Sequence, residues 1–205
     1  MRPYARSSTN RVSHRATYRV DVDIAEFVIE PLVKAHKRAA FSCGNAQLDR
    51  YMRELARQQH AGGGTRVYVM RHVPTDNVAG FYTLSATSIE TINLPQDLVK
   101  NLPRYPTQGA ILIGQLARDL TFRGTDVGKW LLHDALERSV SIQREHLGAV
   151  AVVVDAVDDH AVRFYETFGF ARFAAMPDKL YIPMATIATA SSSTVTSVPA
   201  PAREG

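Results

Sequence analysis

Residues 110–131 read AILIGQLARDLTFRGTDVGKWL and combine residue types that suit the binding of an anion. An apolar strand is predicted to lead through a short loop directly into an amphipathic helix. The first N–H groups of a helix have no partner within the helix, and the helix dipole leaves partial positive charge at that end. Gly124 and Gly128 let a phosphate approach the backbone, and Arg123 adds a full positive charge. By itself, such a glycine pair more often belongs to an ordinary strand–turn–helix connection.

A second element with chemical potential lies at residues 159–170, which read DHAVRFYETFGF. Apolar residues recur there at helical spacing, and Gly169 follows as a helix C-cap. The preceding residues 151–156, AVVVDA, have the pattern of a buried strand. The phenol of Tyr165 is therefore predicted to face the end of the first strand, where a bound phosphate-bearing cofactor would lie.

The order of these motifs resembles the GNAT N-acetyltransferases, which use acetyl-coenzyme A. The strand, the R-x-x-x-x-G loop, the helix, the next strand and F-Y-x-x-x-G-F follow one another as in that family. Upstream, residues 41–69 (FSCGNAQLDRYMRELARQQHAGGGTRVYV) resemble the opening of GNAT toxins from type II toxin–antitoxin systems. Further blocks match at residues 79–90, at PRYP and at residues 113–119. The resemblance covers about residues 24–186 in the family's order.

The resemblance implies an α/β (α+β) fold of the GNAT type, with a central mixed twisted sheet of about six to seven strands flanked by helices. It also implies transfer of acetyl from acetyl-CoA to the amino group of an aminoacyl-tRNA, which blocks translation. The expected partners are the aminoacyl-tRNA and a small ribbon-helix-helix antitoxin. A homodimer is usual in the family, although no sequence feature demonstrates one here.

The same resemblance assigns roles to individual residues. The pantetheine arm is expected to pair with the backbone of Leu116, Ala117 and Arg118. The pyrophosphate is expected on the N–H groups of Arg123, Gly124, Thr125, Asp126, Val127, Gly128 and Lys129. Tyr165 is the expected general acid, since a phenol with a pKa near ~10 stays protonated at neutral pH. Without the family motif, Tyr165 would be read as a packing aromatic. No dedicated base is evident; Glu90 and Asp119 are weak candidates, and water can accept the proton.

Two departures from the family pattern bear on these assignments. Asp126 stands where the usual R-x-x-G-x-G motif has glycine, and its carboxylate would repel pyrophosphate unless it points outward, for instance as a helix N-cap. Gln115 replaces the arginine of the toxins' common G-R-L-A sequence, while Arg118 appears three residues on. We therefore expect weaker coenzyme A binding than in close relatives and a changed mode of holding the acceptor.

The composition indicates one globular domain. The 205 residues are 45% hydrophobic, and no apolar run approaches the ~20 residues of a membrane span. The N-terminus lacks an export signal, so a cytoplasmic location is expected. The only cysteine, Cys43, excludes an internal disulfide and has an expected structural role. The histidines show no spacing typical of a metal site, so no metal is expected.

The positive charge is distributed unevenly along the chain. Five of the arginines that contribute to the net charge of +4 lie in residues 1–20, which contain no acidic residue. Residues 34–71 carry eight basic side chains against two acidic ones. This excess is equally consistent with a solvated surface and with contacts to RNA phosphates, and the toxin resemblance favours RNA. The expected RNA-binding residues are Lys34, Lys37, Arg38, Arg53, Arg57 and Arg66.

Residues 1–19 are predicted to form a flexible arginine-rich arm, residues 20–187 the acetyltransferase domain, and residues 188–205 a disordered low-complexity tail. Helices are predicted over 45–59, 95–101, 127–145 and 159–168. Strands are predicted near 26–30 and over 66–71, 79–89, 110–118 and 149–155, followed by a hairpin of 170–175 with 179–185. Asn45 is the expected N-cap of the first helix, whose apolar stripe comprises Leu48, Met52, Leu55 and Ala56.

Two other functions remain compatible with the sequence. One is a GNAT enzyme that acetylates a small-molecule amine or a protein N-terminus, for which the basic residues of 34–71 have no use. The other is a GNAT-fold binding module without catalysis. Asp126 in the phosphate loop supports that reading, and Tyr165 argues against it.

Overall fold

A mixed sheet of seven strands forms the centre of the molecule, as the resemblance predicts. The computed structural model describes residues 23–194. The strands are β1 (Phe27–Pro31), β2 (Arg66–His72), β3 (Asn77–Glu90), β4 (Thr107–Arg118), β5 (Ala151–Asp155), β6 (Ala171–Phe173) and β7 (Met176–Pro183). Their spatial order is β1-β2-β3-β4-β5-β7-β6. Every neighbouring pair is antiparallel except β4 and β5, which are parallel.

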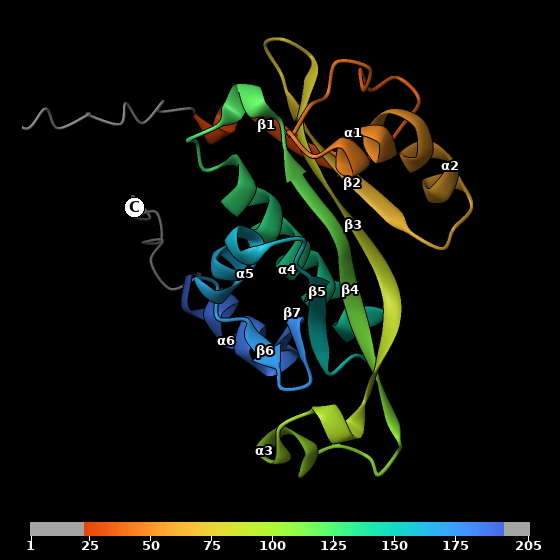
Figure 1. Ribbon diagram of the computed structural model, residues 1–205, viewed down its shortest axis with the longest axis vertical. Coiled ribbons are helices and arrows are strands. Elements are labelled where there is room, and N and C mark those ends of the chain that lie inside the picture. Colours follow the sequence, from red (N-terminus) through yellow and green to blue (C-terminus); the bar gives the residue numbers. More distant parts are fainter. Residues whose placement is uncertain (1–22, 195–205) are drawn as a thin grey trace, which may run out of the picture.

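Helices cover both faces of this sheet (Figure 1). The helices are α1 (Ala46–Arg50), α2 (Ala56–Ala61), α3 (Gln96–Val99), α4 (Val127–Glu145), α5 (Asp159–Glu166) and α6 (Met184–Thr194). Apolar residues of α4, α5 and α6 pack on one face in a shared core. A second cluster joins α1 and α2 to the opposite face of β2 and β3, and a third places α3 against β5 and β7. The part of the sheet that carries the predicted cofactor residues therefore lies between two helical layers.

The first helical segment contains an irregularity that the sequence does not announce. Asn45 caps it as predicted, because its side chain accepts from the N–H groups of Gln47 and Leu48. A π-helical turn over Tyr51–Leu55 then separates α1 from α2. The extra residue of a π-turn rotates the following positions around the axis. Leu55 is consequently 37% exposed, so its assignment to the apolar stripe is wrong, whereas Tyr51 is buried instead.

The remaining predicted elements are present with small changes at their ends. Helix α4 spans the predicted residues, and the first helical segment ends at Ala61, before the three glycines. The turn between β2 and β3 places Asp76 at a φ of 59°, which is tolerated by the short polar side chain of aspartate. The predicted helix over 95–101 is shorter in the structure, where α3 ends at Val99.

Helix α6 extends through Thr194 and so continues beyond the boundary expected at residue 187. Ile187 is buried in the core next to α4, and this packing outweighs the low complexity of the segment. The expected N-terminal arm and the end of the expected tail lie outside the described residues. Within residues 23–194, no helix has the length and apolar character needed to cross a membrane.

Candidate functional site

The edge of β4 opens where β4 and β5 separate. Their parallel ladder covers only residues 111–113 and 152–154. Beyond it, β4 stays paired with β3 as far as Arg118, whereas its β5 side has no strand partner within the described chain. The backbone groups on that side are therefore available to an extended ligand. Leu116, Ala117 and Arg118, the residues expected to contact pantetheine, all lie in this open segment.

A β-bulge shapes the start of the open segment. The register between β3 and β4 shifts between Tyr82 and Leu84, which leaves Gly114 and Gln115 opposite Thr83. The Gln115 N–H donates to Oγ1 of Thr83 over 3.0 Å. Oε1 of Gln115 is enclosed and has no hydrogen-bond partner within the described chain. An enclosed acceptor without a donor is costly, so this amide is a point of lowered stability in the bulge.

The loop that follows β4 is fixed by Asp119. This buried carboxylate accepts from the N–H groups of Ser42 and Thr121, each over 2.8 Å. In return, the N–H of Leu120 donates to the carbonyl of Ser42 over 2.8 Å. The loop before α1 and the loop before α4 are thereby joined. Asp119 is thus a structural anchor, and both of its oxygens are used by backbone donors.

Residues 123–129 form an open cradle at the N-terminus of α4. Gly124 has a φ of +85°, a conformation that favours glycine, and no heavy atom lies within 4 Å of the position that a Cβ would occupy. The space at the Cβ position of Gly128, in the first helical turn, is equally open. The N–H of Trp130 donates to the carbonyl of Asp126, so the N–H groups of Gly128 and Lys129 before it have no carbonyl of the helix to bond. These donors can hold an anion. Three N–H groups expected to contact the pyrophosphate already have acceptors: Arg123 donates to Leu120, Thr125 to Phe122 and Val127 to Oγ1 of Thr125.

Asp126 does not block this cradle. Asp126 occupies the N-cap position of α4, but its side chain makes no capping hydrogen bond and instead pairs with Nζ of Lys129 over 2.8 Å. Both side chains are well exposed. The carboxylate therefore points outward, as the sequence argument required, although it lowers the positive potential at the cradle and engages a lysine expected to contact the cofactor.

Arg118 and Arg123 place two positive charges beside the open strand edge. Burial lowers the pKa of Arg118, and the nearby Arg123 guanidinium lowers it further. Nη1 of Arg118 donates to the carbonyl of Asp119 over 3.3 Å, and neither arginine forms a salt bridge within the described residues. Two like charges held close together favour the arrival of an anion, which would relieve their repulsion.

Tyr165 projects from α5 into the core and is 6% exposed. Asp158 caps this helix by accepting from the N–H of Ala161 over 2.7 Å, and the ring of Tyr165 packs against Phe164 and Phe170. Its hydroxyl makes no hydrogen bond within the described chain. The hydroxyl oxygen is not fully enclosed and so reaches solvent. Burial raises the pKa of Tyr165 well above its ordinary value, and the nearby Asp155 carboxylate raises it further. The phenol therefore remains protonated.

Asp155 links Tyr165 to the open strand edge. It follows Val154, which forms the last pair of the β4–β5 ladder with Ile113. Because Asp155 influences the phenol electrostatically, the hydroxyl lies near the point where the two strands part. Together, the strand edge, the cradle and the phenol can bind an extended chain that ends in a diphosphate and can protonate a leaving group.

The six residues expected to bind RNA fall into three groups. Lys34, Arg57 and Arg66 are exposed and form no ion pair within the described chain. Lys37 pairs with Asp76 over 3.1 Å. The guanidinium groups of Arg38 and Arg53 donate to backbone carbonyls of neighbouring segments, and Arg53 also forms a long ion pair with Asp49 over 3.9 Å.

Cys43 has no features of a nucleophile. Burial raises the pKa of its thiol to about 11, so it is protonated at neutral pH. Its N–H donates to Asp49 over 2.6 Å, which helps to order the loop before α1. Among residues 23–194, no cluster of three or more His, Cys, Asp or Glu side chains is arranged to hold a metal ion.

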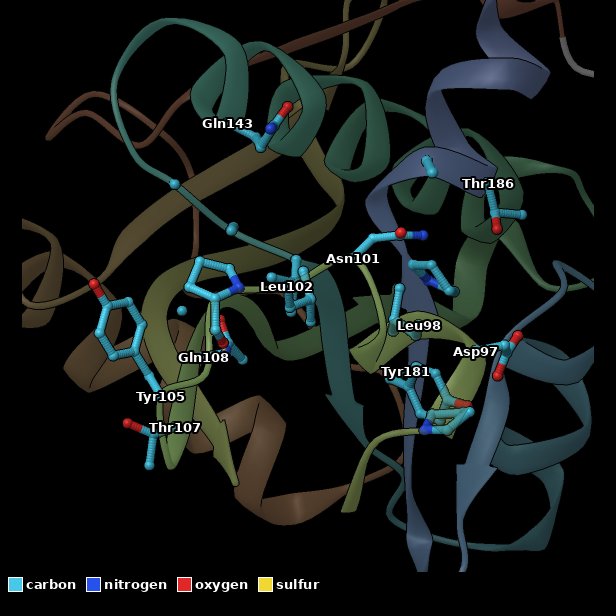
Figure 2. A pocket seen from close by; sticks show the side chains of 18 of the residues that line it. Asp97, Leu98, Asn101, Leu102, Tyr105, Thr107, Gln108, Gln143, Tyr181 and Thr186 are labelled. Atoms are coloured by element: carbon cyan, nitrogen blue, oxygen red, sulfur yellow. Dashed lines mark hydrogen bonds between the residues drawn. The ribbon is translucent and has the colours of Figure 1, made fainter. Parts of the chain in front are cut away.

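A separate cavity of about 950 Å³ is lined by the α3 segment, the start of β4, the loop before β5 and residues of β7 and α6 (Figure 2). None of the residues expected to bind cofactor or RNA lines it, and Asp97 is its only charged lining residue. It opens near the starts of β4 and β5, whereas the cradle and the open edge lie beyond the opposite ends of these strands.

Several contributors to the site were not identified from sequence. Thr83 and Asp155 act through their positions in the sheet register, and Ser42 acts through a contact between distant loops. Gln115 was noticeable in the sequence because it departs from the family pattern. Thr83, Asp155 and Ser42 have no local sequence feature that marks them.

Comparison with known proteins gives a consistent result. No family model matches the chain. The "Probable toxin TacT" of Sinorhizobium fredii is 32% identical over 171 residues, which cover 80% of this chain and 94% of the relative. The "tRNA-acetylating toxin" of Mycobacterium tuberculosis is 34% identical over 131 residues, which cover 64% of this chain and 76% of the relative.

Solved structures agree in fold. AtaT in complex with acetyl-methionyl-tRNAfMet matches with a TM-score of 0.75 at 25% identity, over 80% of this chain and 99% of that chain. A tyrosine-to-phenylalanine variant of AtaT, bound to acetyl-CoA and the C-terminus of the antitoxin AtaR, matches with a TM-score of 0.69 at 20% identity, over 82% of this chain and 99% of that chain. The latter likeness concerns the fold alone.

Proposed function

This chain belongs to the GNAT-type tRNA-acetylating toxins of toxin–antitoxin systems, and from this premise we propose how its residues carry out the reaction. The protein is an acetyl-CoA-dependent acetyltransferase that acetylates the amino group of aminoacyl-tRNA and so blocks translation. The observation that supports this most strongly is the combination, in one place, of the open β4 edge, the cradle of residues 123–129 and the Tyr165 phenol.

Acetyl-CoA fits this arrangement by its chemistry. Its pantetheine amides pair with the backbone of Leu116, Ala117 and Arg118, as a strand would. Its diphosphate rests on the N–H groups at the start of α4, and Arg123 supplies a charge-assisted contact. The Cβ-free positions of Gly124 and Gly128 leave room for the phosphates. The thioester then lies at the point where β4 and β5 part.

The acetyl transfer needs one proton donor at that point. The neutral amine attacks the thioester carbon, the carbon–sulfur bond breaks and the sulfur leaves as a thiolate of coenzyme A. Tyr165 protonates the departing sulfur, because its raised pKa keeps the phenol neutral and its hydroxyl oxygen has no competing partner within the described chain. The proton lost by the amine returns to the phenolate through solvent.

The amine loses its proton to water rather than to a dedicated side chain. Asp119 is committed to the N–H groups of Ser42 and Thr121. Glu90 ends β3 at the far end of the β3–β4 hairpin, where it accepts from Asn93 over 3.4 Å. Neither carboxylate is therefore suited to act as the base.

The exposed cations Lys34, Arg57 and Arg66 provide the surface on which tRNA lies. Arg57 lies near the start of α2, and Arg66 is the first residue of β2. Burial lowers the pKa of His60, and the nearby Arg66 lowers it further. Positive charge without carboxylate partners attracts a phosphate backbone in a salt-dependent manner. A GNAT enzyme for a small amine would have no use for these charges.

An antitoxin is the second partner, as the relative AtaT is bound to the C-terminus of the antitoxin AtaR. We propose a ribbon-helix-helix fold for the antitoxin of this chain and a homodimeric toxin. We also place the protein in the cytoplasm, because both acetyl-CoA and aminoacyl-tRNA are found there.

Acetylation of charged tRNA by the purified protein tests the proposal. Radiolabelled acetyl-CoA is incubated with aminoacylated and deacylated tRNA, and label in the aminoacyl-tRNA fraction is measured. Incorporation that requires the amino acid supports the assignment. Incorporation into small amines alone would favour the alternative enzyme, and binding of acetyl-CoA without any transfer would favour a non-catalytic module.

A further inference from the structure

A second positively charged site lies on the other side of the loop that precedes α1. A surface cavity of about 510 Å³ is lined by Ala35, His36, Lys37, Arg38, Ala39 and Arg53. No carboxylate is among its lining residues. Its lining residues belong to the segment between β1 and α1 and to the π-helical turn. Figure 1 shows that this part of the chain lies on the face of the sheet opposite α4.

Arg38 is held in place at this cavity by the π-turn. Its Nη1 donates to the carbonyls of Met52 over 3.0 Å and Arg53 over 3.2 Å. Nε of Arg38 is enclosed and has no partner within the described chain. Carbonyl groups orient a guanidinium but do not neutralise it, so the full charge of Arg38 remains at the cavity.

Arg53 is oriented in the same way. Its Nε donates to the carbonyl of Phe41 over 2.8 Å, and its Nη2 donates to the same oxygen. The nearest carboxylate, Asp49, is 3.9 Å from Nη2 and is already the acceptor for Ser42 and Cys43. Nη1 of Arg53 has no partner within residues 23–194, which leaves part of its planar donor set for a ligand.

The two other ionisable residues of the lining are paired. Lys37 forms a salt bridge with Asp76, and His36 contacts Glu30 over 3.0 Å through Nε2. Arg38 therefore brings a charge with no carboxylate partner within the described chain, and Arg53 has only the long 3.9 Å contact with Asp49, which does not line the cavity. Their side chains are already ordered, so a ligand would not have to immobilise them.

We infer that Arg38 and Arg53 form a preorganised site for one phosphodiester group of the tRNA backbone. This inference rests on the proposed function and assigns a separate phosphate contact to that substrate. The planar guanidinium groups suit the tetrahedral phosphate oxygens, and a volume of about 510 Å³ admits the phosphate with its adjoining sugars. The exposed Lys34, Arg57 and Arg66 add non-specific attraction around it.

The position of the cavity suits a contact near the acceptor end of the tRNA. Two residues lie between Ala39 and Ser42, so their Cα atoms are at most about 11 Å apart. Ser42 is hydrogen-bonded to Asp119 and Leu120, which lead directly into the cofactor cradle. A phosphate held by Arg38 and Arg53 is thus close to the acetyl donor and is coupled to it through one ordered loop.

Substitution of Ala39 tests the site without removing either arginine. Ala39 is exposed and lines the cavity, so Ala39→Glu adds a carboxylate beside the two guanidinium groups while their carbonyl contacts remain. Ala39→Gln is the matched neutral control. We expect Ala39→Glu to weaken the binding of deacylated tRNA by about tenfold or more and to reduce the slope of log affinity against log salt by about 1. Ala39→Gln should bind like the parent chain.

Three further results decide the matter. The affinity of Ala39→Glu for coenzyme A should be unchanged, because that ligand uses the cradle of residues 123–129. Equal tRNA affinity and salt slope in Ala39→Glu and Ala39→Gln would overturn the inference. Binding of poly-glutamate is measured beside that of tRNA. If Ala39→Glu weakened the binding of poly-glutamate but not of tRNA, the inference would also be overturned, since the cavity would then bind an acidic polypeptide.

The inference and the proposed function fail in different ways. If the parent chain acetylates aminoacyl-tRNA and Ala39→Glu does so with an unchanged KM for tRNA, the enzyme assignment holds and the phosphate site does not. If the parent chain transfers no acetyl group, the proposed function fails, whatever the tRNA affinity of the variants. Thermal denaturation of both variants checks that the fold is retained.

Discussion

Replacement of Tyr165 by phenylalanine removes the proposed proton donor with little other change. The ring packs against Phe164 and Phe170 and keeps these contacts in the variant. The hydroxyl has no hydrogen-bond partner within the described chain, so the free energy of unfolding should change by less than ~1 kcal/mol. Loss of a general acid lowers the rate by about 100- to 10,000-fold, which corresponds to about 3–5 kcal/mol in the barrier.

The assay measures single-turnover transfer of labelled acetyl to aminoacyl-tRNA, together with the affinity for acetyl-CoA. We expect the rate of Tyr165→Phe to fall within the range given above while the affinity stays within about twofold, because the phenol acts on the leaving sulfur. Tyr51→Phe is the matched control. Tyr51 is also buried, and its hydroxyl is enclosed without a partner, so its loss should leave the rate unchanged and stabilise the fold by about 1 kcal/mol.

The pH dependence gives a second readout for Tyr165. Burial and Asp155 raise its folded-state pKa above the ordinary value of 10, so the phenol stays protonated in the folded state at a pH where the unfolded chain begins to ionise. The stability that this group contributes is present below pH 10 and is lost as the pH rises through the folded-state pKa. The transfer rate should accordingly show no decline due to Tyr165 below pH 10. A rate that is unchanged in Tyr165→Phe would refute its role as the acid.

Three more substitutions test the cradle and its support. Asp126→Asn removes a carboxylate beside the diphosphate and should tighten acetyl-CoA binding by about three- to tenfold in isothermal titration. The control Asp178→Asn, on β7, should leave the affinity unchanged. Equal affinities of the two variants would contradict the expectation. Gly128→Ala should raise the melting temperature, since alanine favours the helix by about 1 kcal/mol and no atom obstructs its Cβ. It should nevertheless weaken acetyl-CoA binding at least about tenfold, because the methyl group occupies the space through which the phosphates approach. Unweakened binding would place the diphosphate elsewhere. Asp119→Ala leaves the N–H groups of Ser42 and Thr121 without their acceptor and should lower the free energy of unfolding by about 2–4 kcal/mol in urea denaturation. A decrease below about 0.5 kcal/mol would show that other contacts hold the two loops together.

The parts of the fold that depend on local sequence were predicted well. The N-terminus of α4 follows from a strand, a glycine loop and an apolar helical period that are contiguous in the chain. The Asn45 cap has an equally local cause, since its side chain bonds to N–H groups two and three residues on. The open positions at Gly124 and Gly128 in the cradle of residues 123–129 come from this kind of information. The use of the cradle for acetyl-CoA stays a prediction.

Features that depend on distant contacts were not predictable. The π-turn over Tyr51–Leu55 exposes Leu55 and buries Tyr51, although the sequence reads as a regular helix. Its carbonyls are bonded by Arg38, a residue that no local rule connects with them. Similarly, the tail beyond residue 187 has the composition of a disordered segment, but burial of Ile187 helps to order the start of α6. In each case tertiary packing outweighs local preference.

The basic residues show why counting charges was insufficient to define a binding surface. Residues 34–71 have an excess of positive charge, yet this number does not distinguish a lysine that is neutralised from an arginine that is only oriented. Lys37 has a carboxylate partner, so it adds little attraction for a phosphate. Arg38, by contrast, donates to two carbonyls, has no carboxylate partner within the described chain, and keeps its charge while losing its mobility. Such an arginine is a better phosphate ligand than an exposed one, because the entropy of ordering it has been lost on folding. Residues whose guanidinium groups bond to backbone carbonyls should therefore be counted as binding candidates, and the Ala39 variants test that principle directly.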